Sequence, residues 1–177
     1  QATVNDSTVA ANDTIKGFVL ASASAGINYS TAANFAANTS ATNGGVNTSM
    51  LSIDLTADDA DANANGTNLA VSIEGNATGT GQAAGVTYTV TGGILTLSGN
   101  GAGGVDTLGE WLTEAAAVSA TNGETLAFVF GSDTYTFTQN AAQDVLIKLE
   151  GVSATSLVLA SAATTNAAGA VIIGDGL

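Results

Sequence analysis

Residues 124–151 read ETLAFVFGSDTYTFTQNAAQDVLIKLEG, and the strongest fold signal of the chain lies in this stretch. Apolar residues alternate with smaller or polar ones from Leu126 to Phe130 and again from Thr134 to Thr138, on either side of Gly131-Ser132-Asp133. Period-two spacing around a Gly-containing three-residue turn predicts a β-hairpin. A third alternating strand is predicted at 145–150. Because aromatic side chains bury the most area per residue, we expect this hairpin to form the centre of the core.

Further strand patterns lie on both sides of the hairpin, each bounded by Gly, Asn, Asp or Ser. They are Thr3–Val9, Thr14–Ala21, Met50–Leu55, Leu69–Ile73, Val86–Val90, Ile94–Leu97, Ser156–Leu159 and Ala170–Ile173. Thr91-Gly92-Gly93 separates two of these strands and predicts a second hairpin.

One helix is predicted at about residues 108–120. Thr107 and Glu110 form a Thr-x-x-Glu capping box, and Leu108, Trp111 and Leu112 follow with helical spacing. Asn122-Gly123 suits the end of the helix. We expect the helix to cover one face or end of the sheet, with the single Trp packed inward.

About ten short strands and one short amphipathic helix predict a mainly β fold, of the β-sandwich or Greek-key-like kind. At 177 residues the chain is expected to form a single β-rich domain over 1–177. An alternative subdivision has an N-terminal β part at 1–100 and a helix-plus-hairpin part at 101–177.

The composition restricts the partners. Charged residues make up 10% of the chain, against roughly 25% in ordinary soluble domains. The net charge of −13 comes from fifteen carboxylates against Lys16 and Lys148. Nucleic acid and anionic membrane surfaces are therefore disfavoured, because binding them requires Lys and Arg. No apolar run approaches the roughly 20 residues of a membrane span. A surface of neutral Thr, Ser, Asn, Ala and Gly is typical of extracellular and cell-surface assemblies.

Catalysis is disfavoured by the residue inventory. There is no His and no Cys, which removes the usual general base and the thiol nucleophile. No glycine-rich phosphate loop joins a strand to a helix. Paired carboxylates that serve a glycosidase need aromatic sugar platforms, and one Trp and three Tyr offer few. The sequence therefore predicts a protein that is not an enzyme.

The strongest metal-binding motif is an acidic loop at residues 58–67. From Asp61 it reads Asp-x-Asn-x-Asn-Gly, the first half of an EF-hand-type calcium loop, in which oxygen ligands occupy alternate residues. The predicted calcium ligands are Asp59, Asp61, Asn63, Asn65 and the main-chain carbonyl of Thr67. Position twelve is Ser72 rather than a bidentate Glu. The alternative is an Asx-rich connection whose side chains bond their own backbone.

The sequence contains two weaker patterns. Gly101, Gly104, Asp106 and Leu108 fit part of the calcium-binding nonapeptide repeat, but only one copy is present, so a Gly-rich loop leading into the helix is favoured. Asn-x-Ser/Thr acceptor sites for glycosylation occur at Asn5, Asn12, Asn28, Asn38, Asn47, Asn65 and Asn76.

Two runs resemble a known group of proteins. They are Gly131-Ser132-Asp133-Thr134-Tyr135-Thr136-Phe137 and Asp144-Val145-Leu146-Ile147-Lys148-Leu149-Glu150-Gly151-Val152. Over roughly residues 106–160 the chain resembles the C-terminal region of bacterial type I-secreted (RTX-type) surface proteins, such as surface-layer proteins and large adhesins. The resemblance implies export to the cell exterior, calcium-assisted folding and a structural role. Residues 1–100 show no such resemblance.

We therefore expect a secreted cell-surface protein that assembles with copies of itself into a surface layer or filament, stabilised by calcium. Exposed strand edges are templates for other chains, and we expect Thr3–Val9 to be the strand donated to a neighbour. The alternative is a monomeric adhesin or carbohydrate-binding β-sandwich, for which Tyr29 and Phe35 are the candidate loop aromatics. A hemophore-like carrier is disfavoured because the chain has no His for the iron.

Overall fold

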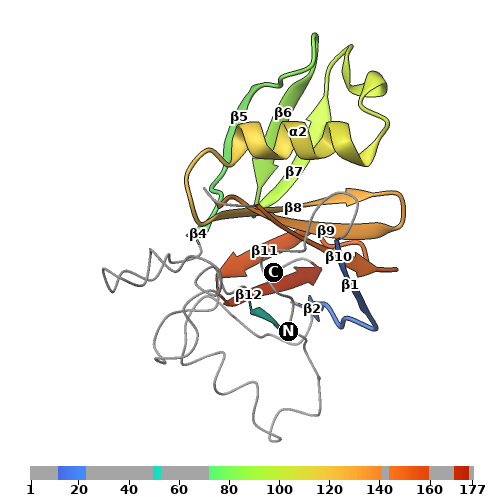
Figure 1. Cartoon of the computed structure of the whole chain (residues 1–177), viewed down its shortest axis with the longest axis vertical. Coiled ribbons are helices and arrows are strands. Elements are labelled where there is room, and N and C mark those ends of the chain that lie inside the picture. The colour runs from blue at the N-terminus through green and yellow to red at the C-terminus, as the bar shows by residue number, and fades with distance from the viewer. Residues whose placement is uncertain (1–11, 23–49, 53–71, 141–143, 160–169, 176–177) are drawn as a thin grey trace, which may run out of the picture.

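The computed structural model describes residues 12–22, 50–52, 72–140, 144–159 and 170–175, and these residues form a mainly β fold (Figure 1). The elements in chain order are β1 (Asp13–Lys16), β2 (Ala21–Ser22), β3 (Met50–Ser52), β4 (Ser72–Ile73), β5 (Ala77–Thr80), β6 (Thr87–Thr91), β7 (Ile94–Ser98), η3 (Ala102–Gly104), α2 (Leu108–Val118), β8 (Glu124–Phe130), β9 (Asp133–Thr138), β10 (Val145–Glu150), β11 (Ser156–Leu159) and β12 (Ala170–Asp175). The predicted fold class, mainly β with one helix, is confirmed.

The strands form two sheets. The larger has the order β1-β10-β9-β8-β7-β6-β5, and β4 also pairs with β8. The smaller has the order β11-β12-β2, with β3 also paired to β12. Four pairings are parallel, namely β1 with β10, β4 with β8, β7 with β8 and β2 with β12. The sheets are therefore mixed, whereas an all-antiparallel Greek key would have no such pairs.

The predicted three-stranded unit lies in the middle of the larger sheet. β8 and β9 pair from Thr125–Thr138 to Phe130–Asp133, and β10 pairs with the other side of β9. The turn contains two residues, Gly131 and Ser132, rather than the three predicted, because Asp133 already pairs with Phe130. Gly131 has φ +67°, which suits a type II′ turn that follows the right-handed twist of the strands.

One face of this unit packs against α2 and the β6–β7 hairpin. Alternate residues of the three strands supply the contact. The buried cluster on this face contains Val90, Leu95, Leu112, Ala115, Leu126, Phe128, Tyr135, Phe137 and Leu146. Phe128 lies at its centre, fully buried between Trp111 (ring centroids 5.3 Å apart) and Tyr135 (5.6 Å). The expectation that the helix covers the sheet with Trp111 packed inward is confirmed.

The opposite face packs against the smaller sheet. Its cluster contains Phe18, Ala127, Val145, Ile147, Leu149, Ala154, Leu157, Val171 and Ile173. Thr134, Thr136 and Thr138 belong to this face and are also buried, at 1% exposure or less. β8–β10 therefore form the middle layer of three, below α2 and above β11–β12 in Figure 1. Because both faces are covered, the hydroxyls of the buried threonines need hydrogen-bond partners. Thr125 Oγ1 and Thr138 Oγ1, for example, lie 2.8 Å apart.

Helix α2 begins where the sequence predicts. Thr107 Oγ1 accepts a bond from the Glu110 N–H, and the Glu110 carboxylate accepts the Thr107 N–H at 3.0 Å, so the capping box is confirmed. The helix ends at Val118, two residues before the predicted end at about residue 120, so Asn122-Gly123 is not its stop. Asn122-Gly123 instead belongs to the turn into β8, where Gly123 has φ +89°.

The N-terminal predictions need correction. The single strand predicted at Thr14–Ala21 is two strands, β1 and β2, which pair with different sheets. Gly17, at φ +69°, lies at the break, and Phe18 between them is buried in the core between the sheets. β5 was not predicted at all. The Thr3–Val9 strand lies outside the described residues.

The second hairpin, β6–β7, connects the two sheets. Its turn residues Gly92 and Gly93 both have positive φ, as a type I′ turn requires. Leu157 at the start of β11 donates its N–H to the Gly92 carbonyl (2.7 Å), and Ala127 donates to the Gly93 carbonyl (2.8 Å). The hairpin turn is therefore hydrogen-bonded to both β8 and β11.

Replacing Gly93 with alanine is expected to destabilise the protein by about 2–5 kcal/mol. A left-handed conformation costs an L-residue about 1–2 kcal/mol, and overpacking a core adds about 1–3 kcal/mol. The new Cβ would lie 2.7 Å from Leu157 Cβ and 2.9 Å from Ile73 Cγ2. Urea unfolding followed by circular dichroism measures the loss.

The matched control is Gly131→Ala. Gly131 has a similar φ of +67°, but an added Cβ there meets no atom within 4 Å. This variant should lose only the conformational part, about 1–2 kcal/mol. Equal losses for the two variants would show that the close approach at Gly93 does not contribute.

Candidate functional site

The predicted calcium ligands Asp59, Asp61, Asn63, Asn65 and Thr67 all lie outside the described residues, so the calcium site stays a prediction. Only position twelve of the loop is described. Ser72 there begins β4, and it pairs in parallel with Glu124 of β8. The end of the candidate loop is therefore tied to the central sheet by strand pairing.

Two carboxylates lie at or next to this junction, those of Glu74 and Glu124. Glu74 donates its N–H to the Thr125 carbonyl (2.9 Å), and the Glu124 carboxylate accepts the Thr121 N–H (2.8 Å). Burial, repulsion by Glu124 and a hydrogen bond between the two side chains raise the pKa of Glu74. Within the described residues, no three acidic side chains gather around one point. Two carboxylates fall short of the six to eight oxygens that calcium prefers, so this pair alone is not a calcium site.

Glu74→Gln is expected to stabilise the protein at pH 7 by about 0.5 kcal/mol, a small gain because both side chains are partly exposed and solvent screens their repulsion. The folded-state pKa of Glu74 lies above its unfolded value. Protonated Glu74 therefore contributes fully to folding stability below the ordinary glutamate pKa of about 4.3. This contribution is lost as the pH rises through the raised folded-state pKa. The advantage of Gln over Glu should shrink towards zero below about pH 4. Thermal unfolding at a series of pH values measures this trend.

The double variant Glu74→Gln/Glu124→Gln separates repulsion from burial. If the pair repels, the two single gains are not additive, because each removes the same repulsion. Additive effects, or an advantage that persists at acid pH, would contradict this assignment.

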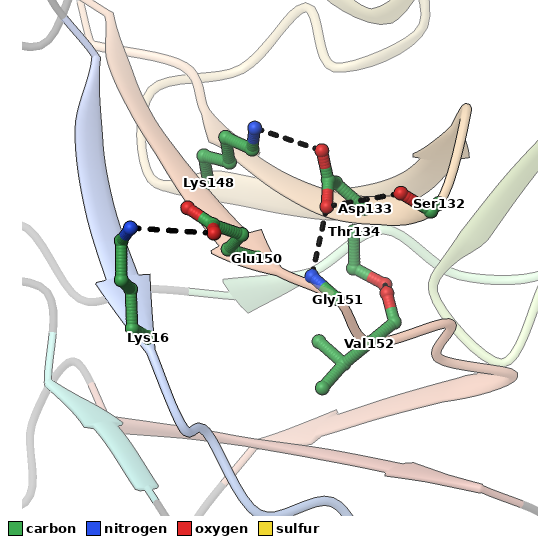
Figure 2. A network of polar contacts seen from close by, with 8 residues as sticks. All are labelled: Lys16, Ser132, Asp133, Thr134, Lys148, Glu150, Gly151 and Val152. Atoms are coloured by element: carbon green, nitrogen blue, oxygen red, sulfur yellow. Dashed lines mark hydrogen bonds and ion pairs between the residues drawn. The ribbon is translucent and has the colours of Figure 1, made fainter.

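A polar network joins the β8–β9 turn to the end of β10 (Figure 2). Asp133 lies at its centre. One carboxylate oxygen lies 2.8 Å from Lys148 Nζ, and the other accepts the Gly151 N–H at 2.8 Å. Beside it, Thr134 Oγ1 donates to the Val152 carbonyl (2.8 Å) and accepts the Ala154 N–H (2.9 Å). Two adjacent residues of β9 therefore hold the chain that leaves β10.

The protonation states of this network are those of a structural ion pair. The hydrogen bond from Lys148, followed by that from the Gly151 backbone, lowers the pKa of Asp133. The bond to Asp133 in turn raises the pKa of Lys148. Both groups therefore remain charged at neutral pH, and neither supplies a free base or an amine nucleophile. The second ion pair, Lys16–Glu150 at 3.3 Å, is exposed and contributes little.

The nonapeptide-like segment is a loop. η3 occupies Ala102–Gly104, and Thr107 caps α2 directly afterwards. Gly101 donates its N–H to the Gly85 carbonyl (3.0 Å), and a Cβ at Gly101 would collide with the backbone of residues 84–86. Close packing against another loop accounts for this glycine, in agreement with the favoured interpretation.

The two edges of the larger sheet differ in charge. β1 carries Asp13 and Lys16. β5 reads Ala-Thr-Gly-Thr, has no charge and no proline, and exposes Thr78 and Thr80. The sequence prediction missed β5 because it contains no large apolar residue, although its Thr residues alternate. A Cβ added at Gly79 would lie 2.7 Å from the Tyr88 ring, so the ring would have to shift.

Comparisons with protein-family models, curated proteins and solved structures found no match to this chain. The resemblance to type I-secreted surface proteins is therefore a proposal that rests on residues 131–137 and 144–152. Within the described part of the chain, no helix has the length and apolarity needed to cross a membrane.

Proposed function

We propose that this chain is an extracellular structural protein that associates with copies of itself through open β-sheet edges. The observation that carries the proposal is β5, which among the residues that the structure describes is an uncharged edge strand at the end of the larger sheet (Figure 1). Soluble proteins commonly protect such edges with Lys, Pro or inward-pointing charges. β5 has none of these, so its outer edge can pair with a strand of another molecule.

The distribution of cations supports this choice of edge. The chain has only two, and neither lies on β5. Lys16 belongs to β1 at the opposite edge, and Lys148 is paired with Asp133. The net charge of −13 opposes close approach of two molecules. We therefore expect association to strengthen with ionic strength, which screens this repulsion.

The test introduces a charge on β5. Thr78→Lys places a lysine on an exposed edge position and should abolish association while leaving the melting temperature within about 2 °C of the wild type, because exposed substitutions cost little. Thr113→Lys adds the same charge on an exposed residue of α2 and is the matched control. Light scattering coupled to size exclusion, with negative-stain microscopy, measures association. A wild-type chain that is monomeric at high concentration and high salt would overturn the proposal and favour the monomeric adhesin.

The donor strand is a separate part of the proposal. Deleting residues 1–11 removes Thr3–Val9 and leaves β1 intact. Loss of assembly in this variant, together with loss in Thr78→Lys, supports pairing of an N-terminal segment with β5 of a neighbour. Assembly that survives the deletion but not Thr78→Lys identifies pairing between β5 strands instead.

The calcium proposal has its own test. If residues 58–67 bind calcium, millimolar calcium should raise the melting temperature, because a ligand that binds only the folded state stabilises it. A chelator should reverse the shift, and Asp61→Ala should remove it. A melting temperature and an assembly state that are indifferent to calcium and chelator would contradict the site.

A further inference from the structure

The larger sheet divides between β7 and β8. These strands pair only at Ile94–Ala127, after which β5–β7 turn away from the direction of β8 (Figure 1). Within the described residues, no strand pairs with β8 on this side beyond Ala127. Val129 of β8, Trp111 of α2 and Ala154 before β11 line a hollow at this division.

An open groove of about 440 Å³ occupies this division. It is lined by Thr91, Ile94, Leu95, Thr96, Trp111, Val129, Ala154 and Thr155. This volume lies within the roughly 300–1,000 Å³ of small-molecule sites in proteins. Five segments supply the lining: β6, β7, α2, β8 and the chain between β10 and β11.

Hydrogen bonds hold the walls of the groove in place. The Gly92 and Gly93 carbonyls accept bonds from β11 and β8, so the β6–β7 turn is fixed at both sides. The Ala154 N–H donates to Thr134 Oγ1, which fixes the opposite wall. A groove formed by fixed walls binds a ligand without the cost of ordering them.

Trp111 gives the groove an aromatic wall. Its ring stacks on Phe128 with an interplanar angle of 19° and also contacts Phe130, at 6.4 Å between centroids. Trp111 is nevertheless not fully buried, and it lines the groove. A large aromatic surface held in one orientation is suited to stacking against a ligand at low entropic cost.

The chemistry of the lining selects the ligand. None of the described lining residues is charged, and the chain as a whole carries −13, so an anionic ligand would be repelled and a cationic one finds no carboxylate among these residues. The lining combines apolar residues with Thr91 and Thr96, two exposed residues that carry hydroxyl groups. The Thr155 hydroxyl donates to Asp175 at 3.1 Å. A ligand that complements such walls has apolar faces and neutral hydroxyl groups.

We propose that the groove beside Trp111 binds a neutral oligosaccharide, with the apolar face of a sugar ring against the indole and its hydroxyls at Thr91 and Thr96. This inference does not depend on self-association, and each can fail without the other. To keep the two apart, binding is measured on the Thr78→Lys variant, in which β5 is blocked.

A glycan array with neutral and acidic members tests the ligand class. We expect binding to neutral glycans and none to acidic ones. Free forms of the bound glycans should then change the fluorescence of Trp111, the single tryptophan, in a saturable way. Binding to no neutral glycan, or only to acidic ones, overturns the proposal. So does quenching of Trp111 by a fatty acid without any effect of glycans, which would assign the groove to apolar ligands.

Hydroxyl-deleted variants test the location. Thr96→Val keeps the shape of the side chain and should weaken binding about five-fold or more, as expected for the loss of one hydrogen bond. Thr80→Val on β5 is the matched control, equally exposed but outside the groove, and should bind like its parent. Trp111→Phe should weaken binding on the array while retaining a ring against Phe128. Equal affinities for Thr96→Val, Trp111→Phe and the control would overturn the assignment to this groove.

Discussion

Phe128→Ala is expected to lower the free energy of unfolding by about 3–5 kcal/mol, the usual cost of deleting a buried aromatic ring. Phe128 has no exposed surface and lies between the rings of Trp111 and Tyr135. Its removal leaves a cavity at the contact between α2 and the central sheet and breaks two ring contacts, each worth about 0.5–1.5 kcal/mol beyond its buried area. Chemical unfolding followed by Trp111 fluorescence measures the loss, and near-ultraviolet circular dichroism should show that Trp111 is no longer fixed.

Phe130→Ala is the control for this variant. Phe130 precedes the β8–β9 turn, is only half-buried and contacts Trp111 in a tilted arrangement at 6.4 Å. Its loss should be clearly smaller, about 1–2 kcal/mol, because part of the ring area is already exposed to solvent. A Phe128→Ala variant that unfolds with the same midpoint as Phe130→Ala would show that the centre of this core has been placed wrongly.

Glu114→Ala is expected to cost about 2–3 kcal/mol, since hydrogen bonds to a charged group contribute about 1.5–3 kcal/mol. Glu114 is 2% exposed. Its two carboxylate oxygens accept the Gln82 and Ala83 N–H groups, each at 2.7 Å. These bonds join the middle of α2 to the segment between β5 and β6. Their loss should loosen that segment, measured as faster amide exchange at Gln82 and Ala83 together with a lower unfolding midpoint.

Glu114→Gln distinguishes the bonds from the packing. The amide has nearly the same shape but only one acceptor oxygen, so it should lose about 1–2 kcal/mol. Gly81→Ala approaches the same contact from the other side, because its Cβ would lie 2.5 Å from Glu114 Oε2 and 2.7 Å from Val86 Cγ1. Unchanged exchange at Gln82 and Ala83 in Glu114→Ala would contradict a linking role for this carboxylate.

Local signals predicted the parts of the fold that depend on neighbouring residues. The alternation in β8, β9 and β10, the capping box at Thr107–Glu110 and the glycine turns each involve residues only a few positions apart. The errors at the ends of these elements are also local. Asn122-Gly123 suits a helix end and a strand-entry turn equally well, and the actual stop at Val118 carries no comparable signal.

The candidate sites likewise differ in whether neighbouring residues or distant parts of the chain form them. The calcium motif is a run of ten residues and could be read directly, although its ligands lie outside the described residues. The groove beside Trp111 draws on residues between Thr91 and Thr155, from five segments. No motif connects them, because only the divergence of β7 from β8 brings them together. The Asp133–Lys148 pair was likewise missed, since its partners are fifteen positions apart and meet through the pairing of β9 with β10.

The sequence by itself determined a mainly β chain with a hairpin at its centre, one capped helix, and a composition with few charged residues, nearly all of them acidic. Tertiary structure alone decided that the strands of this hairpin lie in a middle layer, with threonines such as Thr136 as deeply buried as the phenylalanines opposite them. The physical reason is that alternation fixes which side chains share a face but not what covers that face. A threonine hydroxyl can hydrogen-bond to water or to a buried partner, so a threonine fits an exposed or a covered face. Strand order, the parallel pairings and the groove depend on contacts between residues far apart in the chain.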